Sequence, residues 1–331
     1  MMNQAVKTRS TFETDCLEGL SSTPKHLSSK YFYDEMGSRI FQQIMDMPEY
    51  YLTDCELEIF KSHKQGILSA FSRNHNQFEL IELGAGDGLK TKILLSHFNE
   101  KQLKFSYVPV DISSDSIHEL TQNLNTEIPG LKVKGEIGDY FHCIKNIQLN
   151  GYGKKVLLFL GSNIGNLNEQ QSLSFLIQLR KFMNPSDLIF IGFDLKKDPD
   201  LVLKAYSDPH GHTAAFNLNL LRRMNHELGA NFKLSNFKHH ETYDPLTGTA
   251  KSYLISLKKQ MVHFSNSEVQ VSFDQWEPIS TEISQKYDAK MIEALAHQSG
   301  FEIVENFYDQ RNYFTNSLWK LNNKYESNLE R

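Results

Sequence analysis

The sequence predicts an α/β fold built on a mostly parallel sheet that is covered by helices on both faces. Short apolar runs alternate with helical patterns from residue 78 to residue 193, which is the rhythm of successive β-α units. The apolar runs are nearly continuous, as expected for strands buried on both faces. After Asp194 this rhythm ends, which indicates a second and smaller unit.

Composition and charge limit the kind of protein this can be. The chain has 331 residues, 40% of them hydrophobic and 23% charged, with a net charge of −5. A mildly acidic chain of this kind is a poor partner for nucleic acid. No apolar run reaches the roughly 18 residues of a membrane span, and the first residues lack the apolar core of a secretory signal. The three cysteines have no metal-ligand spacing, which fits a cytoplasmic protein without a metal. We also expect a monomer.

The secondary-structure elements follow from periodicity, in order along the chain. Helical patterns cover residues 38–47 and 53–71. Five strands are then expected at 78–83, 107–112, 131–137, 155–160 and 188–193, with helices at 90–98, 114–124, 140–147 and 169–182. Past residue 194 come a helix at 199–228 that is interrupted at 208–211, strands at 237–243, 251–258 and 268–273, a helix at 284–298, and last strands at 301–308 and 313–320.

A long insertion before the last helix and strands explains this order. We expect residues 61–195 and 286–331 to form the domain that holds the parallel sheet. Residues 1–60 and 196–285 are expected to form a second α+β domain over the ligand-binding edge of that sheet.

The strongest local pattern is the glycine loop Ile81-Glu82-Leu83-Gly84-Ala85-Gly86-Asp87-Gly88. It ends the first strand and opens a helix, where glycines permit positive φ and a ligand can approach the backbone. A dinucleotide-binding fold prefers G-x-G-x-x-G. A strand that ends in an acid and is followed by G-x-G-x-G resembles the first motif of class I S-adenosylmethionine-dependent methyltransferases.

Two further acids stand at strand ends. Asp111 ends the second strand, where a carboxylate can accept hydrogen bonds from both ribose hydroxyls, although NAD-binding folds place an acid similarly. Asp139 follows the third strand and precedes Tyr140, a pair suited to an adenine amino group and ring face. Either acid alone could be an ordinary helix cap or loop residue, but the ordered set favours a nucleoside site.

The loop after the fourth strand, Gly161-Ser162-Asn163-Ile164-Gly165-Asn166, makes the pattern more specific. Together with other segments, it resembles the histidine-specific α-N-methyltransferases of ergothioneine biosynthesis. The other segments are 30–34, 48–53, 193–198, 214–217 and 281–284, and the similarity runs from about residue 21 to the C-terminus.

The resemblance implies a class I methyltransferase sheet with an antiparallel last strand, a second, substrate-binding domain, and an amino-acid substrate that is methylated with S-adenosylmethionine. It implies that the cofactor is bound by Tyr33, Gly84, Gly86, Lys90, Asp111, Asp139 and Tyr140, and that Tyr33, at the reaction centre, is also the catalytic residue. Asn166 and Tyr206 are implied to hold the substrate carboxylate. Tyr50, Glu282 and Ser284 are implied to hold the imidazole, with Phe41 and Gly161 lining the pocket.

One position departs from the pattern of the family. Where these enzymes carry a Met against the imidazole, a gap-free alignment places Ser252, and a shift of one or two residues presents Tyr253 or Leu254 instead. A serine there enlarges the pocket and adds a polar group. Histidine remains the expected substrate, with another aromatic or heteroaromatic amino acid as the alternative.

The expected reaction is repeated methylation of the α-amine, ending in the trimethylated betaine hercynine. Tyr33 either helps to release the amine proton or only positions the amine. Rival classes are an NAD(P)-dependent oxidoreductase, which the glycine spacing disfavours, and a nucleic-acid methyltransferase, which would want Asn/Asp-Pro-Pro-Tyr after the fourth strand. A non-catalytic binding module on the same fold is the third rival.

Overall fold

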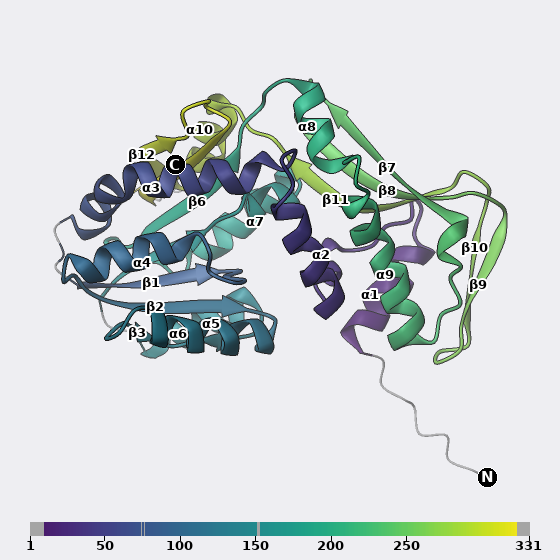
Figure 1. Ribbon diagram of the computed structural model, residues 1–331, viewed down its shortest axis with the longest axis horizontal. Helices are drawn as coiled ribbons and strands as arrows, with labels where there is room; N and C mark the ends of the chain where they lie inside the picture. Colours follow the sequence, from purple (N-terminus) through teal and green to yellow (C-terminus); the bar gives the residue numbers. More distant parts are fainter. Residues whose placement is uncertain (1–9, 74, 76, 151–152, 323–331) are drawn as a thin grey trace, which may run out of the picture. The chain divides into compact units, whose positions relative to one another are not determined.

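The computed structural model describes residues 10–73, 75, 77–150 and 153–322, and the chain divides in it into two units (Figure 1). Met1–Tyr51 and Lys197–Ser284 form one, here called the insertion unit, and Leu52–Lys196 with Gln285–Arg331 form the other, the sheet unit. Residues 1–9, which begin the stretch without a secretory pattern, lie outside the described residues. No helix in the described part of the chain is long and apolar enough to cross a membrane.

The sheet unit is built on eight strands in the order β12-β13-β6-β5-β1-β2-β3, with β4 also paired to β2. The pairs among β6, β5, β1 and β2 are parallel, whereas β13 is antiparallel to both β6 and β12. The prediction of a mostly parallel sheet with an antiparallel last strand is therefore confirmed. The strands are β1 (Gln77–Leu83), β2 (Lys104–Asp111), β3 (Lys132–Val133), β4 (Glu136–Ile137), β5 (Lys154–Phe159), β6 (Leu188–Asp194), β12 (Phe301–Tyr308) and β13 (Phe314–Leu321).

Helices cover both faces of this sheet, as the continuous apolar strands predict. The helices and 3-10 turn of the unit are α3 (Tyr51–Ser72), α4 (Thr91–Glu100), α5 (Ser114–Glu127), α6 (Tyr140–Asn150), η2 (Asn163–Asn166), α7 (Glu169–Arg180) and α10 (Ala289–Gln298). On one face, apolar residues of α6, α7 and α10 share a core with β1, β2, β5 and β6. On the other face, Phe71 of α3 packs edge-on against Phe98 of α4 and Phe190 of β6. Every residue of β5 and β6 is buried, since both faces are covered.

Helix α3 belongs to the sheet unit over almost its whole length. It is continuous from Tyr51 to Ser72, and Phe60 stacks on Phe190 of β6. The division between the units therefore falls at the start of this helix, ahead of the expected boundary after residue 60.

Two expected elements of the sheet unit are wrong in detail. The single strand expected at 131–137 is two short strands, interrupted at Lys134 and Gly135. The backbone passes close to α5 there, since a side chain at Gly135 would lie 2.4 Å from Ile117. The helix expected at 284–298 begins at Ala289, where Asp288 caps it by accepting from the backbone N–H of Met291. Ser284 lies in a strand instead.

The insertion unit combines the first helices with a three-stranded sheet, in the order β11-β8-β7, and a β9-β10 hairpin. Its elements are α1 (Thr11–Ser21), η1 (Ser29–Phe32), α2 (Glu35–Met45), α8 (Pro199–Tyr206), α9 (His212–Leu228), η3 (Leu234–Asn236), β7 (Phe237–Asp244), β8 (Thr249–Ser256), β9 (Gln260–Phe264), β10 (Val269–Phe273) and β11 (Pro278–Gln285). The break expected at 208–211 separates α8 from α9. Strands β9 and β11 were not expected.

The two sequence segments of the insertion unit share one core. Phe12, Phe32 and Ile40 from the N-terminal part lie in the same buried cluster as Phe216 of α9 and Leu254 of β8. The backbone joins them as well, because the N–H of Leu27 donates to the carbonyl of Ser280 in β11 at 2.8 Å. The N-terminal helices thus depend on the inserted residues for their burial.

Candidate functional site

The glycine loop after β1 leaves one open position above the sheet. Gly84, Gly86 and Gly88 all have positive φ, at 76°, 53° and 66°. A side chain at Gly84 would lie 2.8 Å from the Tyr140 hydroxyl, and one at Gly88 would lie 2.6 Å from Leu120. At Gly86 nothing lies within 4 Å of such a side chain, so the loop has open space beside this glycine, as a bound ligand requires.

Asp111 connects the end of β2 to this loop. Its Oδ2 accepts from the backbone N–H of Gly86 at 3.2 Å, and its Oδ1 accepts from that of Ser113 at 3.0 Å. Two apolar side chains that the sequence reasoning missed lie at the same strand ends. Ile112 is 68% exposed, and Ile137, 46% exposed, is the register partner of Asp111 in β4. The signal in the sequence was an isoleucine within two residues of each strand-end acid, Ile112 after Asp111 and Ile137 before Asp139.

Asp139 and Tyr140 begin α6 beside the glycine loop. One oxygen of Asp139 accepts from the backbone N–H groups of Phe141 and His142, so this acid does cap a helix. The ring of Tyr140 packs edge-on against Phe159 with its hydroxyl toward Gly84. Burial, together with the charges of Asp111 and Asp139, raises the pKa of Tyr140 well above its ordinary value, so its hydroxyl stays protonated.

Glu82, the acid of the glycine motif, is a buried side chain that hydrogen-bonds to two neighbouring elements. It accepts hydrogen bonds from Thr91 of α4 at 2.8 Å and from the hydroxyl of Tyr107 in β2. Burial raises the pKa of Glu82 to about 7, although both hydrogen bonds act in the opposite direction. This side chain joins β1, β2 and α4.

Lys90 and Gly161 meet at one buried carboxylate. The Lys90 ammonium pairs with Glu56 at 2.5 Å, and the backbone N–H of Gly161 donates to the same Glu56 oxygen at 2.9 Å. Gly161 has a φ of 67°, and a side chain there would lie 3.1 Å from the Lys90 ammonium. Asn166 ends the 3-10 turn that follows. Sequence reasoning missed Glu56, because nothing local marks an acid inside a long helix.

In the insertion unit, four of the expected site residues form a chain of aromatic rings. Tyr33 packs edge-on against Phe41 with centroids 5.4 Å apart, Phe41 against Tyr50 at 6.1 Å, and Tyr50 against Tyr206 at 6.3 Å. Phe216 closes the chain from α9, with Tyr33 at 5.5 Å and Phe41 at 5.7 Å. Tyr33 is 39% exposed.

The last ring of this chain contacts an expected imidazole-binding residue. The hydroxyl of Tyr206 lies 2.8 Å from that of Ser284 in a buried hydrogen bond. Glu282 lies two residues before Ser284 in β11 and is half-buried. The structure thus brings Tyr33, Phe41, Tyr50, Tyr206 and Ser284 into one continuous set within the insertion unit.

Ser252 lies on the same three-stranded sheet and is already bonded. Its hydroxyl donates to Glu241 of β7 at 2.5 Å, and its backbone carbonyl lies 3.0 Å from the Thr281 hydroxyl. Leu254, one of the alternatives for this position, belongs to the core. The sequence did not reveal Glu241, although it stands directly opposite Ser252 in the hairpin register.

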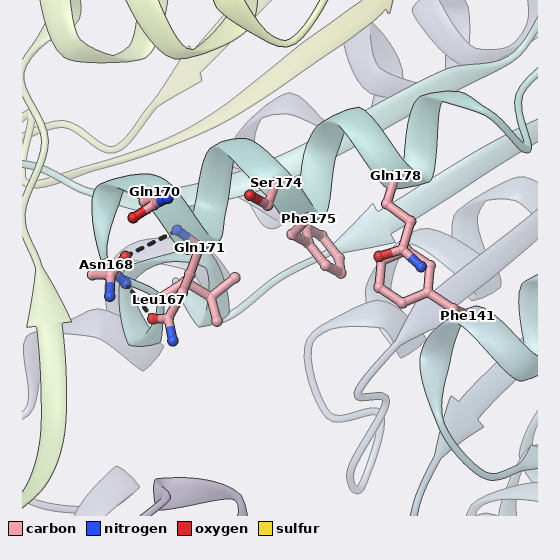
Figure 2. A pocket seen from close by; sticks show the side chains of 8 residues that line it. All are labelled: Phe141, Leu167, Asn168, Gln170, Gln171, Ser174, Phe175 and Gln178. Carbon is pink, nitrogen blue, oxygen red and sulfur yellow. Dashed lines mark hydrogen bonds between the residues drawn. The ribbon is translucent and has the colours of Figure 1, made fainter.

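A hollow of the sheet unit lies along α7 and the start of α6 (Figure 2). Leu167, Phe175 and Phe141 give it an apolar floor, while Asn168 and Gln171 cap α7 by exchanging hydrogen bonds at 2.9 and 3.0 Å. It holds no ionisable side chain and none of the expected site residues.

The parallel sheet with one reversed strand and a G-x-G-x-G loop at its carboxyl edge defines a class I S-adenosylmethionine-dependent methyltransferase. Residues 12–321 match the family model described as histidine-specific methyltransferase, SAM-dependent, and the chain belongs to that family.

Similar proteins agree with this membership. Histidine N-alpha-methyltransferase of Mycobacterium tuberculosis is 32% identical over 304 residues, which are 92% of this chain and 93% of that protein. Ergothioneine biosynthesis protein 1 of Schizosaccharomyces pombe is 31% identical over 234 residues, which are 69% of this chain and 30% of that protein. N-methyltransferase fsqC of Aspergillus fumigatus is 24% identical over 295 residues, 87% of this chain and 78% of that protein.

Proposed function

We propose that this enzyme transfers methyl groups from S-adenosylmethionine to the α-amino nitrogen of L-histidine, three times in succession, to give hercynine. The observation that carries the proposal is the continuous set from Tyr33 to Ser284 in a member of the histidine-specific family. Similarity to a histidine N-alpha-methyltransferase over nearly the whole chain supports the same substrate.

The sheet unit has the residues that fit the cofactor. Open space at Gly86, beside the half-buried carboxylate of Asp111, suits a ribose, and the exposed side chains of Ile112 and Ile137 suit the faces of an adenine ring. We assign Gly84, Gly86, Lys90, Asp111, Asp139 and Tyr140 to this binding. When bound, S-adenosylmethionine supplies a methyl group that its sulfonium already activates.

The substrate side chain is assigned to the insertion unit. Glu282 can accept an imidazole N–H, and Ser284, whose hydroxyl is bonded to that of Tyr206, can serve the other ring nitrogen. Tyr50 and Phe41 add apolar walls, Gly161 is assigned to the lining of the pocket, and Asn166 and Tyr206 are assigned to the substrate carboxylate. A buried polar pocket of this kind selects strongly, because an analogue without matching groups leaves its polar atoms unpaired.

Tyr33 is assigned to the amine. The ammonium group of the substrate must lose a proton before each transfer, since only the neutral amine has a lone pair for the methyl carbon. Tyr33, held edge-on by Phe41 and Phe216, can accept a hydrogen bond from the amine and orient that lone pair. Anchoring at the carboxylate and the imidazole leaves the amine free for repeated methylation.

The experiment that tests the proposal offers S-adenosylmethionine and all twenty amino acids to the purified protein and follows masses for one, two and three added methyl groups. Trimethylated histidine as the main product is the expected result. Another methylated aromatic or heteroaromatic amino acid would retain the chemistry and move the selectivity to the Ser252–Glu241 pair. Cofactor binding without any methylated product would overturn the proposal in favour of a binding module.

We further propose that the enzyme acts as a monomer in the cytoplasm and takes no nucleic acid as substrate. The net charge of −5 supports the last point. Sedimentation velocity of the purified protein tests the monomer, and a dimer over micromolar concentrations would contradict it.

A further inference from the structure

Glu56 is a buried carboxylate whose two oxygens are both used. Its side chain is fully buried in α3, inside the sheet unit. One oxygen accepts from the Lys90 ammonium at 2.5 Å and from the backbone N–H of Gly161 at 2.9 Å. The other accepts from the Asn316 amide of β13 at 2.7 Å, and Gly192 of β6 makes room for it, since a side chain there would lie 2.6 Å away.

These bonds join two loops that are far apart in the chain. Lys90 stands at the start of α4, directly after the glycine loop, and Gly161 follows β5. An ammonium group has three donors, and Glu56 takes one of them, so Lys90 keeps donors for an anionic group of a ligand. The Lys90 side chain is 21% exposed, which places the ion pair at the edge of the core rather than deep within it.

We propose that Glu56 is a positioning residue that also cancels the charge of Lys90 at the cofactor site. This inference rests on the proposed function. S-adenosylmethionine has one net positive charge, because its sulfonium adds to a balanced amino-acid group, whereas S-adenosylhomocysteine has none. Because it is paired with the Glu56 carboxylate, Lys90 can donate to the cofactor carboxylate without adding net repulsion toward the sulfonium.

The decisive variant is Glu56→Gln, which retains the shape and removes the charge. Its amide oxygen can still accept from Lys90 and Gly161. Its amide nitrogen would face Asn316, whose Oδ1 is buried without a hydrogen-bond partner among the described residues and can receive it once the Asn316 amide turns over. The variant can therefore keep a partner for each atom of the former carboxylate, while one amide atom of Asn316 stays unpaired among the described residues, as in the wild type.

Calorimetric titration with each of the two nucleosides separates charge from structure. We expect Glu56→Gln to weaken S-adenosylmethionine binding about tenfold more than S-adenosylhomocysteine binding, because one uncompensated charge remains nearby. Lys90→Met should shift the ratio of the two dissociation constants in the opposite direction. The double variant should restore the wild-type ratio.

Asp187→Asn is the matched control. Asp187 is a fully buried carboxylate of the same unit that accepts two backbone N–H groups, from Lys155 and Asn184, at the amino ends of β5 and β6. Loss of the Asp187 charge should leave the ratio of the two dissociation constants unchanged. Equal weakening of both nucleosides in Glu56→Gln, or an unchanged ratio in Lys90→Met, would overturn the inference, whereas a wild-type protein that binds neither nucleoside would overturn the proposed function instead.

Discussion

The hydroxyl groups of Tyr206 and Ser284 lie 2.8 Å apart and share one buried hydrogen bond, in which either can be the donor. The pair can therefore present a donor or an acceptor to a third group without leaving its own bond unmade. An imidazole nitrogen changes between these two roles with its tautomer. A switchable hydroxyl pair beside Glu282 is thus suited to a histidine side chain.

Removing one hydroxyl of this pair should weaken substrate use. We expect Ser284→Ala to lower kcat/KM for histidine about 10- to 100-fold, because a buried partner is lost, with little change in S-adenosylmethionine affinity. Steady-state kinetics and cofactor titration measure both. Ser256→Ala is the control, since it removes another buried serine hydroxyl of the same sheet. That hydroxyl donates to the backbone carbonyl of Lys258 instead. Equal losses in the two variants would contradict a role for Ser284 in the pocket.

The role of Tyr33 is tested by the pH dependence of Tyr33→Phe. We expect a fall in kcat that is largest below neutral pH, where the protonated fraction of the amine is largest. The affinities for histidine and cofactor should stay within a few-fold. The ring contacts with Phe41 and Phe216 are retained by phenylalanine, so the change isolates the hydroxyl. Unchanged turnover across the whole pH range would leave Tyr33 without a part in handling the proton.

Two glycines of the loop should respond differently to alanine. Gly86→Ala fills open space, so we expect its main effect to be loss of S-adenosylmethionine affinity, with about 1 kcal/mol of backbone strain. Gly88→Ala drives a methyl group to within 2.6 Å of Leu120 and should mainly lower the melting temperature. Thermal unfolding and cofactor titration of both variants check this contrast. A Gly86→Ala protein with full cofactor affinity would show that the ligand lies elsewhere.

Glu82 should make stability depend on pH. Its pKa is about 7 in the folded protein against an ordinary value of 4.5, so the folded state binds more protons between these values. Stability therefore falls as pH rises from about 4.5 to 7, by about 3 kcal/mol for this group. Urea unfolding at pH 5.5 and 8 should show a smaller fall for Glu82→Gln than for wild type.

The control for this measurement is Glu302→Gln, which removes an acid that is half exposed on β12 and pairs with Lys320. Its pH dependence should match that of wild type. If Glu82→Gln and wild type lose the same stability between the two pH values, Glu82 is already ionised at the lower one.

The parallel sheet and its glycine loop could be predicted because both leave local marks. Strands such as β6 are apolar at almost every position, and Gly84, Gly86 and Gly88 stand within five consecutive residues. Strand β11 was missed because its sequence, PISTEISQ, is mostly polar and its two isoleucines, Ile279 and Ile283, are four residues apart, which is a helical spacing. The order of the aromatic site residues came from family resemblance, and no local pattern predicted their contacts.

The buried acids could not be predicted for a different reason. Glu56 contacts Asn316, which is 260 positions away, and Glu241 is recognisable only once the β7–β8 register is known. The local sequences around Glu56 and Glu241 are typical of elements that face the solvent. Burial of a charge depends on the assembled fold, so single-sequence periodicity contains no sign of it.

The interleaving of the two units has a consequence for synthesis on the ribosome. The core around Phe12 and Ile40 is closed by residues as late as Ile279, and β13 at the end of the described chain lies between β6 and β12 in the sheet. Neither unit can finish folding as the chain emerges. The apolar faces of the N-terminal helices therefore stay uncovered until the residues that bury them have been synthesised. Chaperone dependence during translation should therefore be stronger for this enzyme than for a methyltransferase whose domains follow one another in sequence.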